Sequence, residues 1–181
     1  MILQQPLAFI DVETTGLDNE IAEIIELGVV IAKFNKENEL VVTDQIDLKI
    51  HPKHIETAEA AALRINGYDE ADWMFAVTLE DAMKSFSEKT DGAVFVAHNL
   101  TFDYGFIEKA FKATGVENKM HYHKLDTIAV AFGVLHNQDD ISRFSLKALT
   151  EYYGIVNKKA HSAFADAYAT YEVFKKLLNL N

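Results

Sequence analysis

The sequence predicts a mixed α/β fold, in which helices cover a sheet that is not wholly parallel. Two observations lead to this prediction. Three strand patterns come first and are joined by short turns, which is typical of antiparallel hairpins. Strand and helix patterns then alternate along the rest of the chain. The length of 181 residues, with 49% hydrophobic residues, favours a single domain over residues 1–181.

The first strand begins with the apolar run Leu7–Ile10, and two acids follow it, Asp11 and Glu13. Side chains on a strand alternate between faces, so these two carboxylates project from one face, close together. Residues 14–16 then end the strand. Like charges repel and burial opposes ionisation, so a bound divalent cation is the usual way to keep such a pair charged. The alternative is one exposed carboxylate and one held in a hydrogen bond.

Two further strands complete the first part of the predicted sheet. The segment Ile24–Ala32 is rich in β-branched residues, and Leu40–Ile50 follows a turn at Asn35–Asn38. We expect these strands and the first one to form an antiparallel meander. A short helix follows, which we expect Thr57 to cap and Gly67 to end.

The second half of the chain alternates helices with short strands. A helix capped by Thr78 runs to Lys89, and the apolar run Ala93–Ala97 is typical of a strand buried on both faces. A helix from about Phe102 to Thr114 comes next. The remaining expected elements are a strand near Lys124 and Leu125, and helices at Asp126–Leu135, Ser145–Tyr153 and Ser162–Leu178, with a polar loop at His136–Ser142.

Three more residues are candidates for chemistry. Asp103 lies in the first turn of its helix, where an acid also suits the helix dipole, but it is beside the apolar stripe. Asp166 shares the inner face of the last helix with small residues such as Ala163 and Ala167, which would let that helix lie close to the sheet. His161 precedes the same helix and, with an unperturbed pKa of about 6.5, suits proton transfer from water. Burial of Asp166 without a partner would be costly, which favours a functional role.

Composition excludes several classes of protein. There are no cysteines, so disulfides, thiolate zinc sites and cysteine nucleophiles are excluded. The net charge of -11 argues against a broad basic surface for nucleic acid, although metals at an acidic site could still contact phosphate. No apolar run approaches 18 residues, so we expect no membrane association and a cytoplasmic protein.

Three stretches together resemble the motifs of the DEDDh family of 3′–5′ exonucleases, the DnaQ-like group. They are Phe9–Leu17, His98–Asp103 and His161–Asp166, and they occur in the family's order. The similarity spans nearly the whole chain and includes Leu125–Thr127. The resemblance implies a ribonuclease H-like fold with a central five-stranded mixed sheet.

The resemblance also implies roles for individual residues. Asp11, Glu13, Asp103 and Asp166 would hold two Mg²⁺ or Mn²⁺ ions, with Asp11 bridging both, and His161 would be the general base. The pocket for the terminal nucleotide would be lined by Thr14, Thr15, Gly16, Leu17, His98, Asn99 and Phe102, with Leu17 wedged against a base.

The implied activity is release of nucleoside 5′-monophosphates from 3′ ends, with single-stranded DNA favoured over RNA. The alternatives are an exoribonuclease of the ribonuclease T type and a non-catalytic module that binds nucleic-acid ends or a replisome partner. A DNA polymerase is a further expected partner. Because the sequence ends at Asn181 without the tail that tethers the family's proofreading subunit, it favours a stand-alone exonuclease or a module held by other surfaces.

Overall fold

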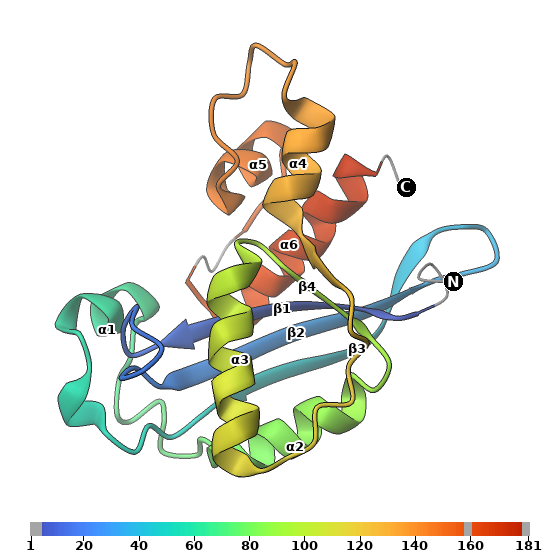
Figure 1. Ribbon diagram of the computed structural model, residues 1–181. Coiled ribbons are helices and arrows are strands. Elements are labelled where there is room, and N and C mark those ends of the chain that lie inside the picture. Colours follow the sequence, from blue (N-terminus) through green and yellow to red (C-terminus); the bar gives the residue numbers. More distant parts are fainter. Residues whose placement is uncertain (1–4, 158–160, 179–181) are drawn as a thin grey trace.

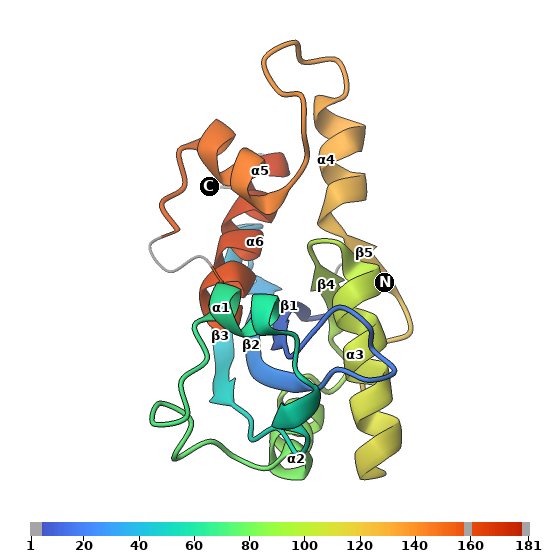
Figure 2. The ribbon, with the colours of Figure 1, turned by 90° about the vertical axis from the view of Figure 1, so that its left-hand side faces the viewer.

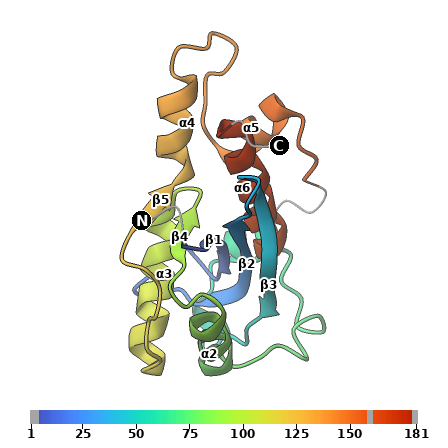
Figure 3. The same cartoon turned by 90° about the vertical axis from the view of Figure 1, so that its right-hand side faces the viewer.

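A five-stranded mixed sheet forms the centre of the computed structural model, which describes residues 5–157 and 161–178 (Figure 1). The strands are β1 (Leu7–Thr14), β2 (Ile24–Phe34), β3 (Leu40–Lys49), β4 (Val94–Ala97) and β5 (Lys124–Asp126). Their order, β3-β2-β1-β4-β5, can be followed in Figure 3. The first three strands pair antiparallel, and β4 pairs parallel with both β1 and β5. The predicted meander and mixed sheet are therefore confirmed.

Helices cover both faces of the sheet (Figure 1). They are α1 (Ala60–Asn66), α2 (Leu79–Lys89), α3 (Leu100–Thr114), α4 (Thr127–Leu135), α5 (Leu146–Tyr153) and α6 (Ala163–Leu177). Residues of α2 and α3 pack on one face of the sheet and those of α6 on the other, while α4 and α5 pack against α6. No helix among the described residues is long and apolar enough to cross a membrane.

The structure confirms some of the predicted helix ends and corrects one. Thr78 accepts a hydrogen bond from the N–H of Asp81 at the start of α2, as predicted. The predicted cap at Thr57 is wrong, because this residue lies in a short 3₁₀ turn (Ile55–Thr57) and its hydroxyl donates to a backbone carbonyl of that turn. The N-cap of α1 is instead Glu59. The predicted end at Gly67 is confirmed, since this glycine adopts a φ of 67°.

The helix that follows β4 begins earlier than the sequence predicts. It starts at Leu100 rather than Phe102, and its N-cap Asn99 has a positive φ of 68°. Asn adopts this left-handed backbone conformation more readily than most residues other than glycine, and the conformation turns the chain sharply between β4 and α3. As a result, Asp103 lies in the first turn of α3, directly beyond the end of β4.

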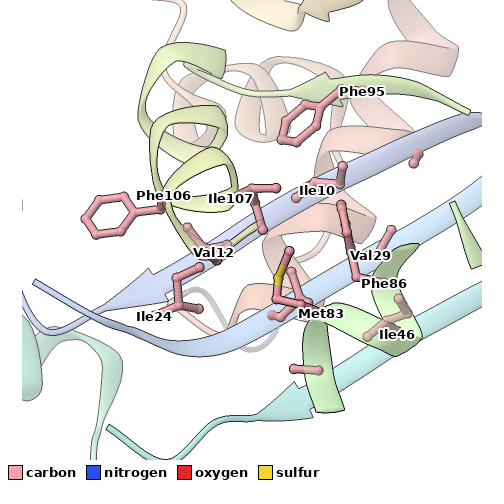
Figure 4. Packing of buried hydrophobic residues seen from close by; sticks show 14 of the residues in the cluster. Ile10, Val12, Ile24, Val29, Ile46, Met83, Phe86, Phe95, Phe106 and Ile107 are labelled. Atoms are coloured by element: carbon pink, nitrogen blue, oxygen red, sulfur yellow. The ribbon is translucent and has the colours of Figure 1, made fainter. Parts of the chain in front are cut away.

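The two faces of β1 pack against different helices. Ala8, Ile10 and Val12 belong to the larger apolar core, which α2 and α3 cover (Figure 4). Leu7 and Phe9 face the opposite way, into a core that includes residues of α6. Since the alternation continues along the strand, the next odd-numbered residues lie on the α6 face, and these are the two acids.

Candidate metal centre

The last residues of β1 leave one edge of the strand open. β1 pairs with β2 up to Thr14, but its pairing with β4 stops at Phe9. The N–H of Val12 therefore has no sheet partner on that side, and it donates instead to Oδ1 of Asp103 at 3.0 Å. Asp103 is only 3% exposed. The backbone of β1 thus pairs with this buried acid and fixes its carboxylate beside the strand.

A glycine brings α6 onto the sheet at the level of the acids. Gly28 of β2 is the register partner of Asp11 in β1. A Cβ atom at Gly28 would lie 2.2 Å from the backbone carbonyl of Ala163, the first residue of α6. No residue with a side chain fits there without moving the helix. Together with the buried side chains of Ala163 and Ala167, this contact carries Asp166 to the end of β1.

Glu13, His161 and Asp166 form a cluster of potential metal ligands. One ligand atom from each lies within 4.8 Å of the other two. His161 has a positive φ of 69°, which is unusual for a residue other than glycine, and its N–H donates to Oδ2 of Asp166 at 3.0 Å. Oδ1 of the same carboxylate accepts from the side-chain amide of Asn157 at 2.5 Å. The segment before α6 thus holds both oxygens of Asp166.

Electrostatics shows how strongly the acids interact. Burial, followed by the charges of neighbouring carboxylates including Asp103 and Asp166, raises the pKa of Asp11 well above its ordinary value. Burial and the charges of Asp166 and Glu26 raise the pKa of Glu13 to about 7. Burial raises the pKa of Asp103 to about 8. Ionised, these carboxylates repel one another, and a bound cation would offset that repulsion. Carboxylate oxygens are the ligands of hard divalent ions, so the donor set fits Mg²⁺ or Mn²⁺.

A fifth acid, Glu26, was not among the predicted site residues. It is 8% exposed and lies on β2 as the register partner of Glu13. Its Oε2 accepts a hydrogen bond from the N–H of Ala163 at 3.1 Å, and Lys49 lies 3.9 Å from its other oxygen. It thus links the sheet to the start of α6. The signal in the sequence was an acid that interrupts the otherwise apolar strand Ile24–Ala32.

The residues after β1 form a rigid loop rather than a row of free polar side chains. The hydroxyl of Thr14 donates to the carbonyl of Gly16 at 2.7 Å, and Thr15 is 1% exposed. Both threonines therefore offer only their backbone to a ligand. Leu17 is 76% exposed, and its N–H donates to Oε1 of Glu59 at 3.2 Å. An apolar side chain held in water by a fixed backbone is well placed to meet a ligand.

The remaining predicted residues lie at the ends of β4 and α3. Nδ1 of His98 is 2.9 Å from the hydroxyl of Thr127 in α4, and burial lowers the pKa of the imidazole. Asn99 is exposed, and Phe102 is half-buried. Asp126 was seen only as part of a matching segment, yet its carboxylate caps α4 and accepts from the first N–H of α3 at 3.1 Å. It thereby fixes the helix that carries the buried acid of α3.

Figure 2 views the molecule from the side on which β1 ends, where α1, α3 and α6 surround the strand. The structure brings the five predicted catalytic residues to this end from β1, α3 and the start of α6. It places the predicted nucleotide-binding residues in the adjoining loop and at the start of α3. It does not bring the side chains of Thr14, Thr15 and His98 into one open pocket, because each is engaged within the fold.

Comparison with known proteins agrees with this architecture. The model of the exonuclease family RNase_T matches residues 8–174. The chain is 33% identical over 178 residues to a PolC-type DNA polymerase III of Caldanaerobacter subterraneus, covering 97% of this chain and 12% of that protein. It is 28% identical to a ribonuclease T of Shewanella, covering 94% of this chain and 80% of that protein.

A solved structure shows the same fold. The zinc-bound form of an E. coli exonuclease I complex with single-stranded DNA superposes with a TM-score of 0.80 at 18% identity, covering 97% of this chain and 41% of that one. The fold is therefore ribonuclease H-like, as predicted. The chain spans about one eighth of the PolC-type polymerase and less than half of exonuclease I.

Proposed function

The chain belongs to the exonuclease family, and from this membership we propose that it is a divalent-metal-dependent 3′–5′ exonuclease that acts on single-stranded DNA. The observation that carries the proposal is the convergence of Glu13, His161 and Asp166, beside the half-buried Asp11 and the buried Asp103, where β1 ends. A binding module has no need to concentrate negative charge where a phosphate must lie. A hydrolase that uses metals does.

Each residue of the centre has a distinct proposed role. Asp11, Glu13, Asp103 and Asp166 would hold the divalent ions. When bound, such ions lower the pKa of an attacking water and neutralise charge on the leaving 3′ oxygen. The deep burial of Asp103 and its bond to the backbone of β1 fix one side of this ligand set before any ion arrives.

His161 is the proposed general base. Histidine is the side chain that most often acts as a general base, taking a proton from water in the transition state. The residue is exposed and lies just before α6, where a change in backbone angle could move the ring toward a substrate. Its positive φ is consistent with a residue whose position serves chemistry rather than folding.

The loop after β1 is proposed to meet the terminal nucleotide. Leu17 supplies an exposed apolar surface for the base, while residues 14–16 supply backbone groups. Asn99 and Phe102 at the start of α3 border the same region. Contact with only the last nucleotides of the strand would reconcile a chain of net charge -11 with a polyanionic substrate.

Labelled oligonucleotides test the proposal. Single strands carrying a label at the 3′ or the 5′ end are incubated with the protein and Mg²⁺, with and without EDTA. We expect stepwise shortening from the 3′ end, release of nucleoside 5′-monophosphates and complete inhibition by EDTA. Shortening from the 5′ end alone would contradict the polarity, and binding without release would leave only a non-catalytic module.

RNA is a second candidate substrate. It is favoured by the similarity to ribonuclease T, whose length the match covers to 80%. DNA and RNA share the scissile chemistry and differ at the 2′-hydroxyl, which is the group a protein must contact to tell them apart. Competition between DNA and RNA strands of one sequence, followed by the two rates of shortening, decides between them.

A further inference from the structure

We propose that the cavity between α5 and α6 is a second substrate subsite, in which Lys147 binds the phosphodiester on the 5′ side of the scissile bond. The inference rests on the proposed function, because it extends the same site. The cavity has a volume of about 420 Å³, within the range of about 300–1,000 Å³ typical of ligand sites. His161 and Asp166 line one part of it, and Lys147 and Thr150 of α5 line another. It therefore shares two residues with the metal centre.

The path of the strand follows from the two sides of that centre. The later part of the loop that carries Leu17 lies against α3, where Nζ of Lys109 donates to the carbonyl of Ala22 at 3.2 Å. The N–H of Leu17 itself donates to Glu59 at the start of α1. The helices α5 and α6, whose residues line the cavity, lie on the other side of β1 from α3 (Figure 2). With the terminal nucleotide on the α3 side and the scissile phosphate at the acids, the rest of the strand leaves past Asp166 and His161. The next phosphate is then inside or at the mouth of this cavity.

That phosphate needs a positive partner that the metal centre does not provide. Of the described residues that line the cavity, Lys147 is the only lysine or arginine. Its side chain is 86% exposed, and its carboxylate neighbour Glu151 is 4.0 Å away and 68% exposed. An exposed pair of this kind contributes little, because water and salt screen both charges. The ammonium group is therefore free to exchange this partner for a phosphate at little cost.

Because the chain is acidic, a single lysine beside the substrate has a large influence on phosphate binding. With 28 acids against 17 basic residues, the protein repels a polyanion except where cations gather. A lysine acts on phosphate as a mobile point charge without base selectivity, so this subsite would affect affinity and salt dependence but not sequence preference. Any backbone phosphate of single-stranded nucleic acid carries the recognised chemistry.

The variant Lys147→Ala tests the subsite, and Lys112→Ala is a matched control. Lys112 also forms an exposed i,i+4 pair with a glutamate, at 3.6 Å, but on α3. We expect Lys147→Ala to raise the KM for a single-stranded oligonucleotide about 3- to 10-fold with kcat nearly unchanged. We also expect log(kcat/KM) to fall less steeply with log[salt], with a slope smaller in magnitude by about 0.7. We expect Lys112→Ala to behave as the wild type. Equal behaviour of the two variants would overturn the subsite.

A neutral linkage in the substrate identifies which phosphate is bound. The oligonucleotide carries a single uncharged methylphosphonate in place of the phosphate on the 5′ side of the scissile bond. We expect its affinity for the wild type to be about as low as the affinity of the normal strand for Lys147→Ala. In Lys147→Ala, the methylphosphonate should lower the affinity almost no further. Binding is read by fluorescence anisotropy with Asp11→Asn in both backgrounds, so that no strand is cut. An equal loss with and without Lys147 would refute the assignment.

The two proposals fail in different ways. If the wild type releases no nucleotides from a 3′ end in Mg²⁺, the proposed function fails. If it releases them and Lys147→Ala keeps the wild-type KM and salt slope, only the subsite fails.

Discussion

The two halves of β1 obey opposite rules. The first half, Leu7–Ile10, is apolar, at most 5% exposed, and its backbone pairs with β4 over Leu7–Phe9 as well as with β2. The second half, Asp11–Thr14, pairs only with β2 and places two carboxylates on the face where Leu7 and Phe9 are apolar. The first half of the strand therefore belongs to the core and the second half to the site. The change from one to the other falls between Ile10 and Asp11.

The contrast between the two halves shows which part of β1 stabilises the fold and which part destabilises it. Buried rings in the first half stabilise the sheet against α6, since Phe9 contacts Tyr171 and Phe174 edge to face at 5.4 and 5.3 Å. The two half-buried carboxylates in the second half oppose folding unless a cation offsets their repulsion. Substitutions in the two halves should consequently affect stability and activity in opposite senses.

The largest expected effect is the loss of activity on changing Asp11→Asn. This variant keeps the size of the side chain but removes a charge that would hold the proposed ions, so we expect nucleotide release to fall to background. Because the amide no longer repels the neighbouring acids, the metal-free protein should become more stable than the wild type, as measured by its thermal midpoint.

Asn at an exposed acid provides the control for that variant. Asp91→Asn changes the same functional group in the turn after α2, so both rate and thermal midpoint should stay near those of the wild type. An Asp11→Asn protein that keeps nearly full activity would show that the metal centre is wrongly assigned. One that is less stable than the wild type without metal would contradict the contrast within β1.

The next largest effect is expected at Phe9 in the first half. This ring is fully buried, so Phe9→Ala should lower the free energy of unfolding by about 3–5 kcal/mol. Phe75→Ala makes the same change at a side chain that is 91% exposed, and should stay within about 0.5 kcal/mol of the wild type. Urea unfolding followed by circular dichroism measures both. Similar losses in the two variants would show that the core contact of Phe9 has been overestimated.

Glu26 offers a smaller and more selective way to disturb the second half. Glu26→Ala removes the acceptor that holds the first N–H of α6, so we expect affinity for Mn²⁺ to fall by about 10- to 100-fold, as for other residues that orient metal ligands. Glu26→Gln keeps an acceptor oxygen and should lie closer to the wild type. Mn²⁺ titration followed by electron paramagnetic resonance measures this without substrate. Unchanged affinity in Glu26→Ala would mean that other contacts position α6.

The sequence predicts the first half of β1 better than the supports of the second. Apolar runs and alternation suffice for the strands, and the spacing of Asp11 and Glu13 gives their shared face without any tertiary information. The order of the motifs adds Asp103, His161 and Asp166. All five arrive at one place because the sheet order sets β4 beside β1 and Gly28 admits α6.

The supporting residues depend on contacts that no local pattern encodes. Glu26 binds a residue 137 positions away, and Glu59 binds the N–H of Leu17 from 42 positions away. The wrong cap predicted at Thr57 has the same origin. Thr57 lies in a 3₁₀ turn, and the N-cap of α1 is Glu59, whose N–H donates to the carbonyl of Thr15 after β1. Local propensity is a weak guide wherever such a tertiary contact decides.

The acids of the second half also predict a dependence of stability on pH that runs opposite to the usual one. Glu13 has a pKa of about 7 in the folded protein against 4.5 in the unfolded chain, and Asp103 about 8 against 3.8. Between these values the folded state binds more protons than the unfolded state, so stability falls as the pH rises. Without metal we expect the thermal midpoint to decrease between pH 5 and 8, by roughly 2–4 °C for each kcal/mol lost.

The cations that the centre fits should cancel this decrease, because they replace the protons. Addition of Mg²⁺ or Mn²⁺ at pH 8 should therefore raise the midpoint more than the same addition at pH 5. Glu13→Gln removes one of the two titrations and should flatten the metal-free profile between pH 5 and 7. A midpoint that rises from pH 5 to 8 without metal would mean that these acids are ionised at no cost, and the contrast between the halves of β1 would then rest on packing alone.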